Sequence, residues 1–342
     1  MNQKNLNVKN KNGKLIIKHL RNKKVSQIFK KFEKSFNIKK DFAVAVSGGP
    51  DSLSLAYLSK IYAIKYNLKA KFFIVDHRLR HGSTLEARVA ADLLKKINIE
   101  CQILKWIGKK PLTNIQSLAR NKRYSLLVNK CNKYRINNLL LGHHLDDLFE
   151  NFFIRMLRGS GLNGLISLDK NSVFQGINFH RPLLDFEKKD LIYLSKKVFN
   201  FFIQDPSNKN DNFKRTRVRN LINFLGSEGL DKNKFLLTIS NLKDADKSIK
   251  FYVEKNITKN SYFFKKNNSV ILNKSFFDQS HEVMFRSLTE VIKIIGGRYY
   301  PVRGKSLSDV IHKISSDKLI KVTLGGCFIE KVNQSIIISK EV

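Results

Sequence analysis

The chain has 342 residues and carries 64 lysines and arginines against 28 acidic residues, a net charge of +36 that favours polyanionic partners. Its 42% hydrophobic content and 25 phenylalanines exclude wholesale disorder, and its length indicates two domains. No apolar stretch approaches the roughly 18 residues that span a membrane, so we expect a cytoplasmic protein whose partner is nucleic acid, with no membrane partner.

The first half of the chain alternates strands and helices. Buried strands are predicted at residues 42–46, 71–75, 99–104 and 138–141. A helix is predicted after each of them, at residues 53–66, 84–97, 115–131 and 145–158. This alternation indicates an α/β fold, a parallel twisted sheet with helices on both faces. Ligands of such sheets bind beyond the carboxyl ends of the strands.

The pattern changes in the second half, where a helix at 186–200 and a turn-rich linker at 204–212 precede a basic helix. Mixed helices and short strands follow. We predict three parts: a basic N-terminal tail over residues 1–24, a catalytic domain over 25–220, and a smaller, mostly helical C-terminal domain with short strands over 221–342. The tail has no hydrophobic segment of the kind found in a secretory signal.

The three cysteines, Cys101, Cys131 and Cys327, lie far apart in the sequence and form no CxxC pair. This spacing indicates a reducing compartment. It argues against a disulfide scaffold, a zinc ribbon and an iron–sulfur site.

A glycine loop, Ser47-Gly48-Gly49-Pro50-Asp51-Ser52, joins the first predicted strand to its helix. Backbone N–H groups converge there at a positive helix N-terminus, which suits a phosphate group. The loop is not a Walker A element, because no lysine follows the glycines. It resembles the loop of enzymes that split ATP into AMP and pyrophosphate, with Asp51 placed to help hold Mg²⁺. The alternative is an ordinary strand-to-helix turn.

A second polar cluster, Asp76-His77-Arg78-Leu79-Arg80, follows the second predicted strand. Arg78 and Arg80 suit phosphates, and the backbone here suits an adenine ring. A solvated charged loop is the alternative. The position of the cluster, at the same sheet edge as the glycine loop, favours the functional interpretation.

A third cluster follows the fourth strand and continues into a helix that carries Asp146, Asp147 and Glu150. Asp147 and Glu150 are spaced i, i+3 and share a helix face. Such carboxylates suit Mg²⁺ or a cationic amine, and helix capping is the ordinary alternative for Asp146. The preceding His143 and His144 do not favour a zinc site, because adjacent histidines rarely bind one ion and HExxH spacing is absent.

Two groups of arginines add positive charge. Arg120 and Arg123 share a helix face, and a second group, Arg215, Arg217 and Arg219, lies near the predicted domain junction. The second group suits a triphosphate or an RNA backbone, although solvated charge explains either group. The GxGxxG match at residues 159–164 follows a helix rather than a strand, so it is not a dinucleotide fingerprint.

Taken together, seven motifs resemble the tRNA(Ile)-lysidine synthetase family in order and spacing over roughly residues 40–225. They are SGGPDS (47–52), VDHRLR (75–80), ARNKRY (119–124), GHHLDDLFEN (142–151), RGSGLNGL (158–165), RPLL (181–184) and DPSN…FKRTRVRN (205–220). GGRYYP (296–301) and TLGGC (323–327) also resemble forms of that family. The family usually has Glu-Thr where this chain has Glu150-Asn151.

The resemblance implies a PP-loop fold of the adenine-nucleotide α-hydrolase type and a two-step reaction. The C2 oxygen of wobble cytidine 34, in a tRNA(Ile) with a CAU anticodon, attacks the α-phosphate of ATP and releases pyrophosphate. Free L-lysine then attacks C2 through its ε-amine and expels AMP. ATP and Mg²⁺ are implied as cofactors. The resemblance is compatible with a monomer or a homodimer.

The resemblance also implies roles for individual residues. Catalysis is assigned to Asp51, His143, Asp147 and Glu150, the last two receiving the lysine ammonium. Mg²⁺ is assigned to Asp51. The residues expected to bind ATP are Ser47, Gly48, Gly49, Pro50, Asp51, Ser52, Asp76, His77 and Arg80. The residues expected to bind substrate phosphates are Arg120, Arg123, Arg215, Arg217 and Arg219. The alternatives are another PP-loop tRNA-modifying enzyme, of the thiolase type, or a non-catalytic RNA-binding protein.

Overall fold

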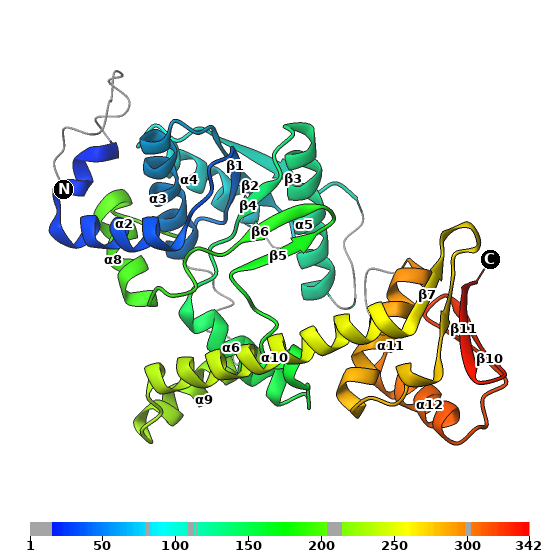
Figure 1. Cartoon of the computed structure of the whole chain (residues 1–342). Helices are drawn as coiled ribbons and strands as arrows, with labels where there is room; N and C mark the ends of the chain where they lie inside the picture. Colours follow the sequence, from blue (N-terminus) through cyan, green and yellow to red (C-terminus); the bar gives the residue numbers. More distant parts are fainter. Residues whose placement is uncertain are drawn as a thin grey trace. The chain divides into compact units, whose positions relative to one another are not determined.

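The computed structural model describes residues 16–79, 82–108, 113, 115–203, 214–297 and 302–341 (Figure 1). The chain divides into two compact units, Met1–Leu230 and Asp231–Val342, which are described separately. The predicted boundary at residues 220–221 differs from this division, because it lies inside α9 (Lys214–Ser227). The basic N-terminal half of α9 resembles a junction in sequence, but the helix continues without a break.

The first unit contains a six-stranded sheet of order β3-β2-β1-β4-β6-β5. The strands are β1 (Phe42–Val46), β2 (Ala70–Asp76), β3 (Cys101–Lys105), β4 (Asn138–Leu140), β5 (Asn171–Phe174) and β6 (Ile177–His180). All neighbours pair in parallel except β5 and β6. The predicted parallel sheet is therefore confirmed.

The β5–β6 hairpin was not predicted. Its two turn residues, Gln175 and Gly176, both have positive φ, as a tight hairpin turn requires. The β5 side chains are mostly exposed, so the segment lacks the alternation of apolar residues that marks a half-buried strand.

Helices cover both faces of this sheet, as expected. The helices of the first unit are α2 (Lys23–Ser35), α3 (Pro50–Tyr66), α4 (Ser83–Lys95), α5 (Ile115–Lys133), α6 (Leu145–Met156), α7 (Leu162–Leu165), α8 (Lys188–Phe199) and α9. Val44 and Val46 of β1 belong to the core under α3, α4 and α8, whereas Ala43 belongs to the core under α5. Figure 1 shows α3 and α5 on opposite sides of the strands.

The predicted N-terminal tail is wrong from Ile16 onward. Ile16 is buried in the core, and its carbonyl oxygen accepts a hydrogen bond of 3.3 Å from the Tyr57 hydroxyl. A short 3₁₀ helix, η2 (Lys18–Arg21), follows. Asn22 then caps α2, because its side chain accepts a hydrogen bond from the Val25 N–H. The many lysines conceal an apolar residue that anchors this segment.

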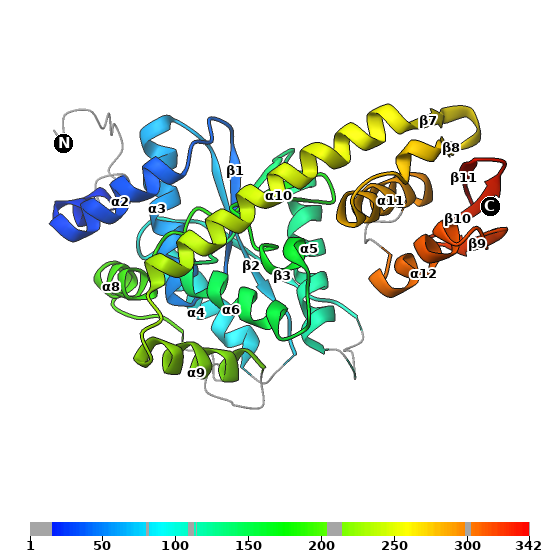
Figure 2. The ribbon, with the colours of Figure 1, turned by 60° about the horizontal axis from the view of Figure 1, so that its bottom comes forward.

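The second unit begins with the long helix α10 (Lys232–Asn260). A five-stranded antiparallel sheet follows, of order β7-β8-β11-β10-β9. Its strands are β7 (Ser261–Phe264), β8 (Ser269–Leu272), β9 (Lys321–Leu324), β10 (Cys327–Val332) and β11 (Ser335–Lys340). Helices α11 (His281–Gly296) and α12 (Gly304–Ser315) lie on one side of the strands (Figure 2). The predicted helical domain with short strands is confirmed.

No helix among the residues described is both long enough and apolar enough to cross a bilayer.

Candidate active site

Three loops meet at the carboxyl edge of the first sheet, where β1 lies between β2 and β4. They enclose a cavity of about 350 Å³. Its polar lining residues are Ser47, Asp51, Ser52, His77, Ser83, Glu86, Arg123, Tyr124, His143 and Lys188. The fold thus brings together residues from β1, β2, β4, α5 and α8 that are distant in sequence.

The glycine loop is held by close backbone packing. Gly48 has φ +87°, and a Cβ there would lie 2.5 Å from Ile203 Cδ1. Its carbonyl oxygen accepts a 3.0 Å hydrogen bond from the Ile203 N–H. Only glycine fits this conformation and this contact without strain.

Ser52 ties the loop to the first turn of α3. Its hydroxyl accepts from the Ser47 N–H at 3.0 Å and donates to the Gly49 carbonyl at 3.0 Å. Pro50 is the first helical residue, where a missing N–H costs nothing. The result is a fixed helix N-terminus facing the cavity, a geometry that binds anions.

The loop after β4 lies close to the first turn of α3. A Cβ on Gly142 would lie 3.3 Å from both the nitrogen and the Cα of Ser52. The distance between this loop and α3 therefore depends on the absence of a side chain at Gly142.

Asp51 is paired on one oxygen only. Lys188 Nζ lies 2.7 Å from Asp51 Oδ2, and His144 Nε2 lies 3.6 Å from the same atom. Asp51 Oδ1 is buried and has no hydrogen-bond partner among the residues that the structure describes. This free oxygen fits a Mg²⁺ ion that takes its other ligands from phosphates and water. Within the described ranges, no cluster of three or more His, Cys, Asp or Glu residues is placed to hold a metal ion by itself.

Lys188 was missed by the sequence analysis. It is the first residue of α8 and lies far along the chain from Asp51. No local pattern marks it, because its role depends on the contact between α8 and α3.

Asp76 organises the loop after β2. Burial alone would raise the pKa of Asp76, but hydrogen bonds from Thr84, the Arg78 N–H and Ser83 hold it below its usual range. Both carboxylate oxygens are engaged in this way, so Asp76 shapes the loop. His77 lines the cavity, whereas Arg80 lies outside the described residues.

The N-terminus of α6 is closed by a reciprocal cap. The His144 N–H donates to Asp147 Oδ2 at 3.0 Å, and the Asp146 N–H donates to His144 Nδ1 at 3.2 Å. Burial opposes ionisation of Asp147, but His144 and His143 keep its pKa below its usual range. Asp147 is therefore a charged group that already serves the helix.

His143 is neutral at physiological pH. Burial lowers its pKa to about 3 against the opposing charge of Asp147, and Arg181, Arg120 and Arg123 lower it further. Its Nδ1 atom is buried and finds no hydrogen-bond partner in the described part of the chain. A neutral imidazole in the cavity wall binds through a hydrogen bond rather than through charge.

Glu150 lies on the same helix and is only 2% exposed. Arg219 of α9 donates to it from Nε at 2.5 Å and from Nη2 at 3.4 Å. Burial raises the pKa of Glu150, with Arg219 and Arg215 opposing the shift. Both members of this pair were predicted as site residues, but their contact with each other was not.

The remaining arginines separate into two groups. Arg120 and Arg123 lie over the ring of Tyr124, with guanidinium carbons 4.9 and 5.3 Å from the ring centre. Only Arg123 of these two lines the cavity. On α9, Arg215 and Arg219 are four residues apart and share a face, whereas Arg217 lies on another.

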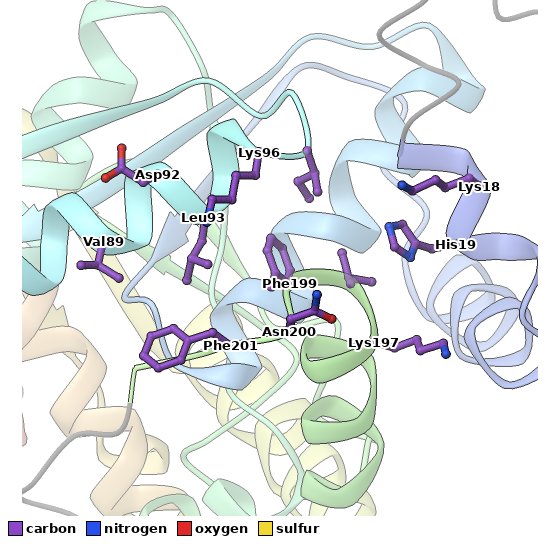
Figure 3. A pocket seen from close by; sticks show the side chains of 12 residues that line it. Lys18, His19, Val89, Asp92, Leu93, Lys96, Lys197, Phe199, Asn200 and Phe201 are labelled. Atoms are coloured by element: carbon purple, nitrogen blue, oxygen red, sulfur yellow. The ribbon is translucent and has the colours of Figure 1, made fainter.

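A second cavity of about 620 Å³ lies elsewhere on the first unit (Figure 3). It is lined by Lys18 and His19, by α4 residues such as Asp92 and Leu93, and by residues near the end of α8. It has none of the strand-end loops, so we assign the chemistry to the smaller cavity.

The sheet order and the strand-end loops define a PP-loop ATPase-like domain. In agreement, the family model described as "PP-loop domain" matches residues 18–225. The U34-tRNA thiolase from Methanococcus maripaludis has a similar fold, with a TM-score of 0.56 at 18% identity. The match covers 64% of this chain and 78% of the thiolase chain.

Curated relatives are more informative. A tRNA(Ile)-lysidine synthase from Orientia tsutsugamushi is 36% identical over 310 residues, which is 87% of this chain and 69% of the relative. One from Wolbachia pipientis is 33% identical over 302 residues, 87% of this chain and 70% of the relative. The chain belongs to the tRNA(Ile)-lysidine synthase family of enzymes.

Proposed function

We propose that this protein uses ATP to ligate lysine to C2 of cytidine 34 in a tRNA(Ile) with a CAU anticodon, releasing AMP and pyrophosphate. The observation that carries the proposal is the position of two sites at one sheet edge. A phosphate-binding loop with Asp51 lies beside the acidic helix α6, and a Cβ on Gly142, just before α6, would lie only 3.3 Å from the main chain of Ser52. Family membership supports the same activity.

In the first step, the glycine loop and the N-terminus of α3 bind the ATP phosphates. Asp51 would hold Mg²⁺ with the oxygen that is not paired, while Lys188 keeps the other oxygen in place. When bound, Mg²⁺ neutralises negative charge on the phosphates. Neutral His143 and charged Arg123 hydrogen-bond phosphate oxygens as the C2 oxygen of the cytosine attacks the α-phosphate.

In the second step, α6 binds the ammonium group of lysine. Asp147 and Glu150 supply the negative charge, but Glu150 is already paired with Arg219. The ammonium therefore competes with the guanidinium, or binds mainly to Asp147. Either carboxylate then accepts a proton as the amine attacks C2 and AMP leaves.

The second unit, Asp231–Val342, supplies tRNA affinity in this proposal. One flipped base offers little binding surface, and selection among similar tRNAs needs further contacts. The net charge of +36, counted over the whole chain, supports phosphate contacts with counterion release by the intact protein. The affinity for tRNA should therefore fall steeply as salt rises.

A thiolase-type reaction is less well supported. Sulfur transfer needs reactive thiolates, and burial raises the pKa of Cys101 to about 11 and that of Cys131 to about 12. Cys327 is also buried. The thiols of Cys101 and Cys131 are therefore poor nucleophiles at neutral pH.

The deciding experiment combines radiolabelled lysine, ATP, Mg²⁺ and a transcript with the CAU anticodon. We expect label in the RNA together with AMP and pyrophosphate, and none with a transcript in which cytidine 34 is replaced by uridine. ADP as the product, or sulfur incorporation, would overturn the proposal. A protein that binds the RNA without forming AMP would be a non-catalytic RNA-binding protein.

A further inference from the structure

The sheet of the second unit has one covered face and one open face. Side chains along its strands alternate between buried and partly exposed, as on a sheet packed on one side only. The buried set includes Val270, Leu272, Ile329, Ile336 and Ile338, which form a core with α11 and α12.

The other set defines what we call the open sheet face: Tyr262, Phe264, Ile271, Phe328 and Ile337, together with Ser269 and Ser339. The strand register places these residues side by side. Tyr262 pairs with Ile271, Ile271 with Ile337 and Ile337 with Glu330, so this row ends in a carboxylate. Phe264, Ser269, Ser339 and Phe328 form the next row. None of them belongs to the core under α11 and α12.

The second row has a distinctive shape. Two small serines lie between Phe264 on the outermost strand and Phe328 on β10. The two aromatic residues are therefore separated by three interstrand spacings of about 4.8 Å each. Two aromatic rings thus border a low, polar strip.

Positive charge surrounds these rings. Lys265 and Lys266 follow Phe264 in the β7–β8 turn, and every residue from Tyr262 to Asn268 is exposed. Within the described part of the chain, no carboxylate pairs with either lysine. Lys321 Nζ lies 4.9 Å from the centre of the Phe328 ring and is paired with Glu330 at 3.4 Å.

We propose that the open sheet face binds unpaired nucleotides of the tRNA, with bases stacked on Tyr262, Phe264 and Phe328 and phosphates near Lys265 and Lys266. The inference rests on the proposed function, which makes tRNA the substrate. Exposed aromatic residues on an antiparallel sheet are a common platform for single-stranded RNA. Each stacked base contributes affinity without sequence preference, and the lysines add phosphate contacts.

Charge decides between RNA and a second copy of the chain as the occupant. β7 is an edge strand, and an exposed apolar edge also suits pairing with another strand. A second copy would bring its own Lys265 and Lys266 to this edge, so like charges would face each other. A polyanion meets no such repulsion.

The test measures affinity for a short oligoadenylate and for a duplex RNA with equal phosphate number, without ATP or lysine. We expect Phe264→Ala and Tyr262→Ala each to weaken oligoadenylate binding roughly fivefold or more, with the salt dependence unchanged. The matched control is Phe251→Ala, because Phe251 is equally exposed but lies on α10. Lys265→Gln with Lys266→Gln should reduce the salt slope by about 0.7 per lysine.

A direct reporter uses the single tryptophan of the chain, Trp106 in the first unit. In a Trp106→Phe background, Tyr262→Trp should show fluorescence quenching by oligoadenylate and little by the duplex. Unchanged affinity in both alanine variants would overturn the proposal. A change in oligomeric state without a change in RNA affinity would also overturn it and assign the face to self-association.

The two proposals fail separately. If the oligonucleotide measurements succeed but the intact enzyme transfers no lysine to the CAU transcript, only the proposed function is lost. If lysine transfer succeeds, Phe264→Ala should raise KM for tRNA and leave kcat unchanged. An unchanged KM in an active enzyme would refute the open sheet face as a tRNA site.

Discussion

Arg219 Nε lies 2.5 Å from Glu150 Oε1, so a cation of the protein itself occupies the acidic helix. Glu150 is nearly inaccessible to solvent, whereas the Arg219 side chain is 37% exposed. The more accessible member of the pair is therefore the arginine. A lysine ammonium that binds Glu150 must displace this guanidinium. The affinity for lysine then depends on how much more strongly Glu150 binds the ammonium than the guanidinium.

Removing this cation should strengthen lysine binding. We expect Arg219→Met to lower KM for lysine several-fold, because the competing guanidinium is gone. Stability should fall by less than the roughly 3–5 kcal/mol of a fully buried pair, because Arg219 is partly exposed. Lysine-dependent turnover at several lysine concentrations measures the effect. A higher KM would mean that Arg219 orients Glu150 for the substrate.

Removing the carboxylate should have the opposite effect. Glu150→Gln keeps the size of the side chain but loses the charge that faces the ammonium, so KM for lysine should rise about tenfold. Pyrophosphate release with tRNA alone should persist. Glu187→Gln, a change of an exposed carboxylate on the same unit, is the control. Loss of pyrophosphate release in Glu150→Gln would mean that Glu150 acts in the first step, on ATP, and not in lysine binding.

Asp51→Asn should abolish pyrophosphate release, with a loss of about 100-fold or more, because it removes the charged ligand proposed for Mg²⁺. The assay measures pyrophosphate from ATP and tRNA without lysine. Asp92→Asn, in the larger cavity of the same unit, should leave the rate unchanged. Equal activity of Asp51→Asn and the unchanged protein would exclude a role for Asp51 in metal binding.

His143 should make stability depend on pH. The folded state keeps this imidazole neutral down to about pH 3, whereas the unfolded chain binds a proton near pH 6.5. Below pH 6.5 the unfolded state therefore binds more protons, and stability falls by up to about 1.4 kcal/mol per pH unit. Above pH 6.5 this contribution is fully present. Urea unfolding between pH 5 and 7 should show a smaller slope for His143→Gln, and equal slopes would contradict the prediction.

Alanine substitutions at two glycines distinguish the cost of backbone strain from the cost of side-chain crowding. Gly48 and Gly176 both have positive φ, but a Cβ at Gly176 meets nothing within 4 Å. Gly176→Ala should lower the free energy of unfolding by about 1 kcal/mol, because alanine is strained at positive φ. Gly48→Ala should cost about 1–3 kcal/mol more, because the new methyl group meets Ile203. Equal losses in thermal unfolding would mean that Ile203 moves aside freely.

The sequence predicts what depends on local pattern. The four parallel strands and their helices follow from apolar runs between turns, and the strand-end loops follow from their order. Lys188 reaches Asp51, and Arg219 reaches Glu150, only through helix packing that no local pattern encodes. Ile16 was missed because a single apolar anchor is hidden among lysines. The hairpin at Gln175-Gly176 was missed because one of its strands is exposed.

The close approach of Gly142 to Ser52 limits the distance between the nucleotide loop and the acidic helix α6, whatever the amino-acid composition of the rest of the chain. The chain is rich in lysine, asparagine and isoleucine, as AT-rich coding would produce, and such drift replaces side chains throughout a protein. The separation of the nucleotide loop and the acidic helix leaves too little space for a side chain at Gly142 beside the main chain of Ser52. Substitutions elsewhere therefore leave the spacing between the two half-reactions intact, so long as residue 142 acquires no carbon beyond its backbone.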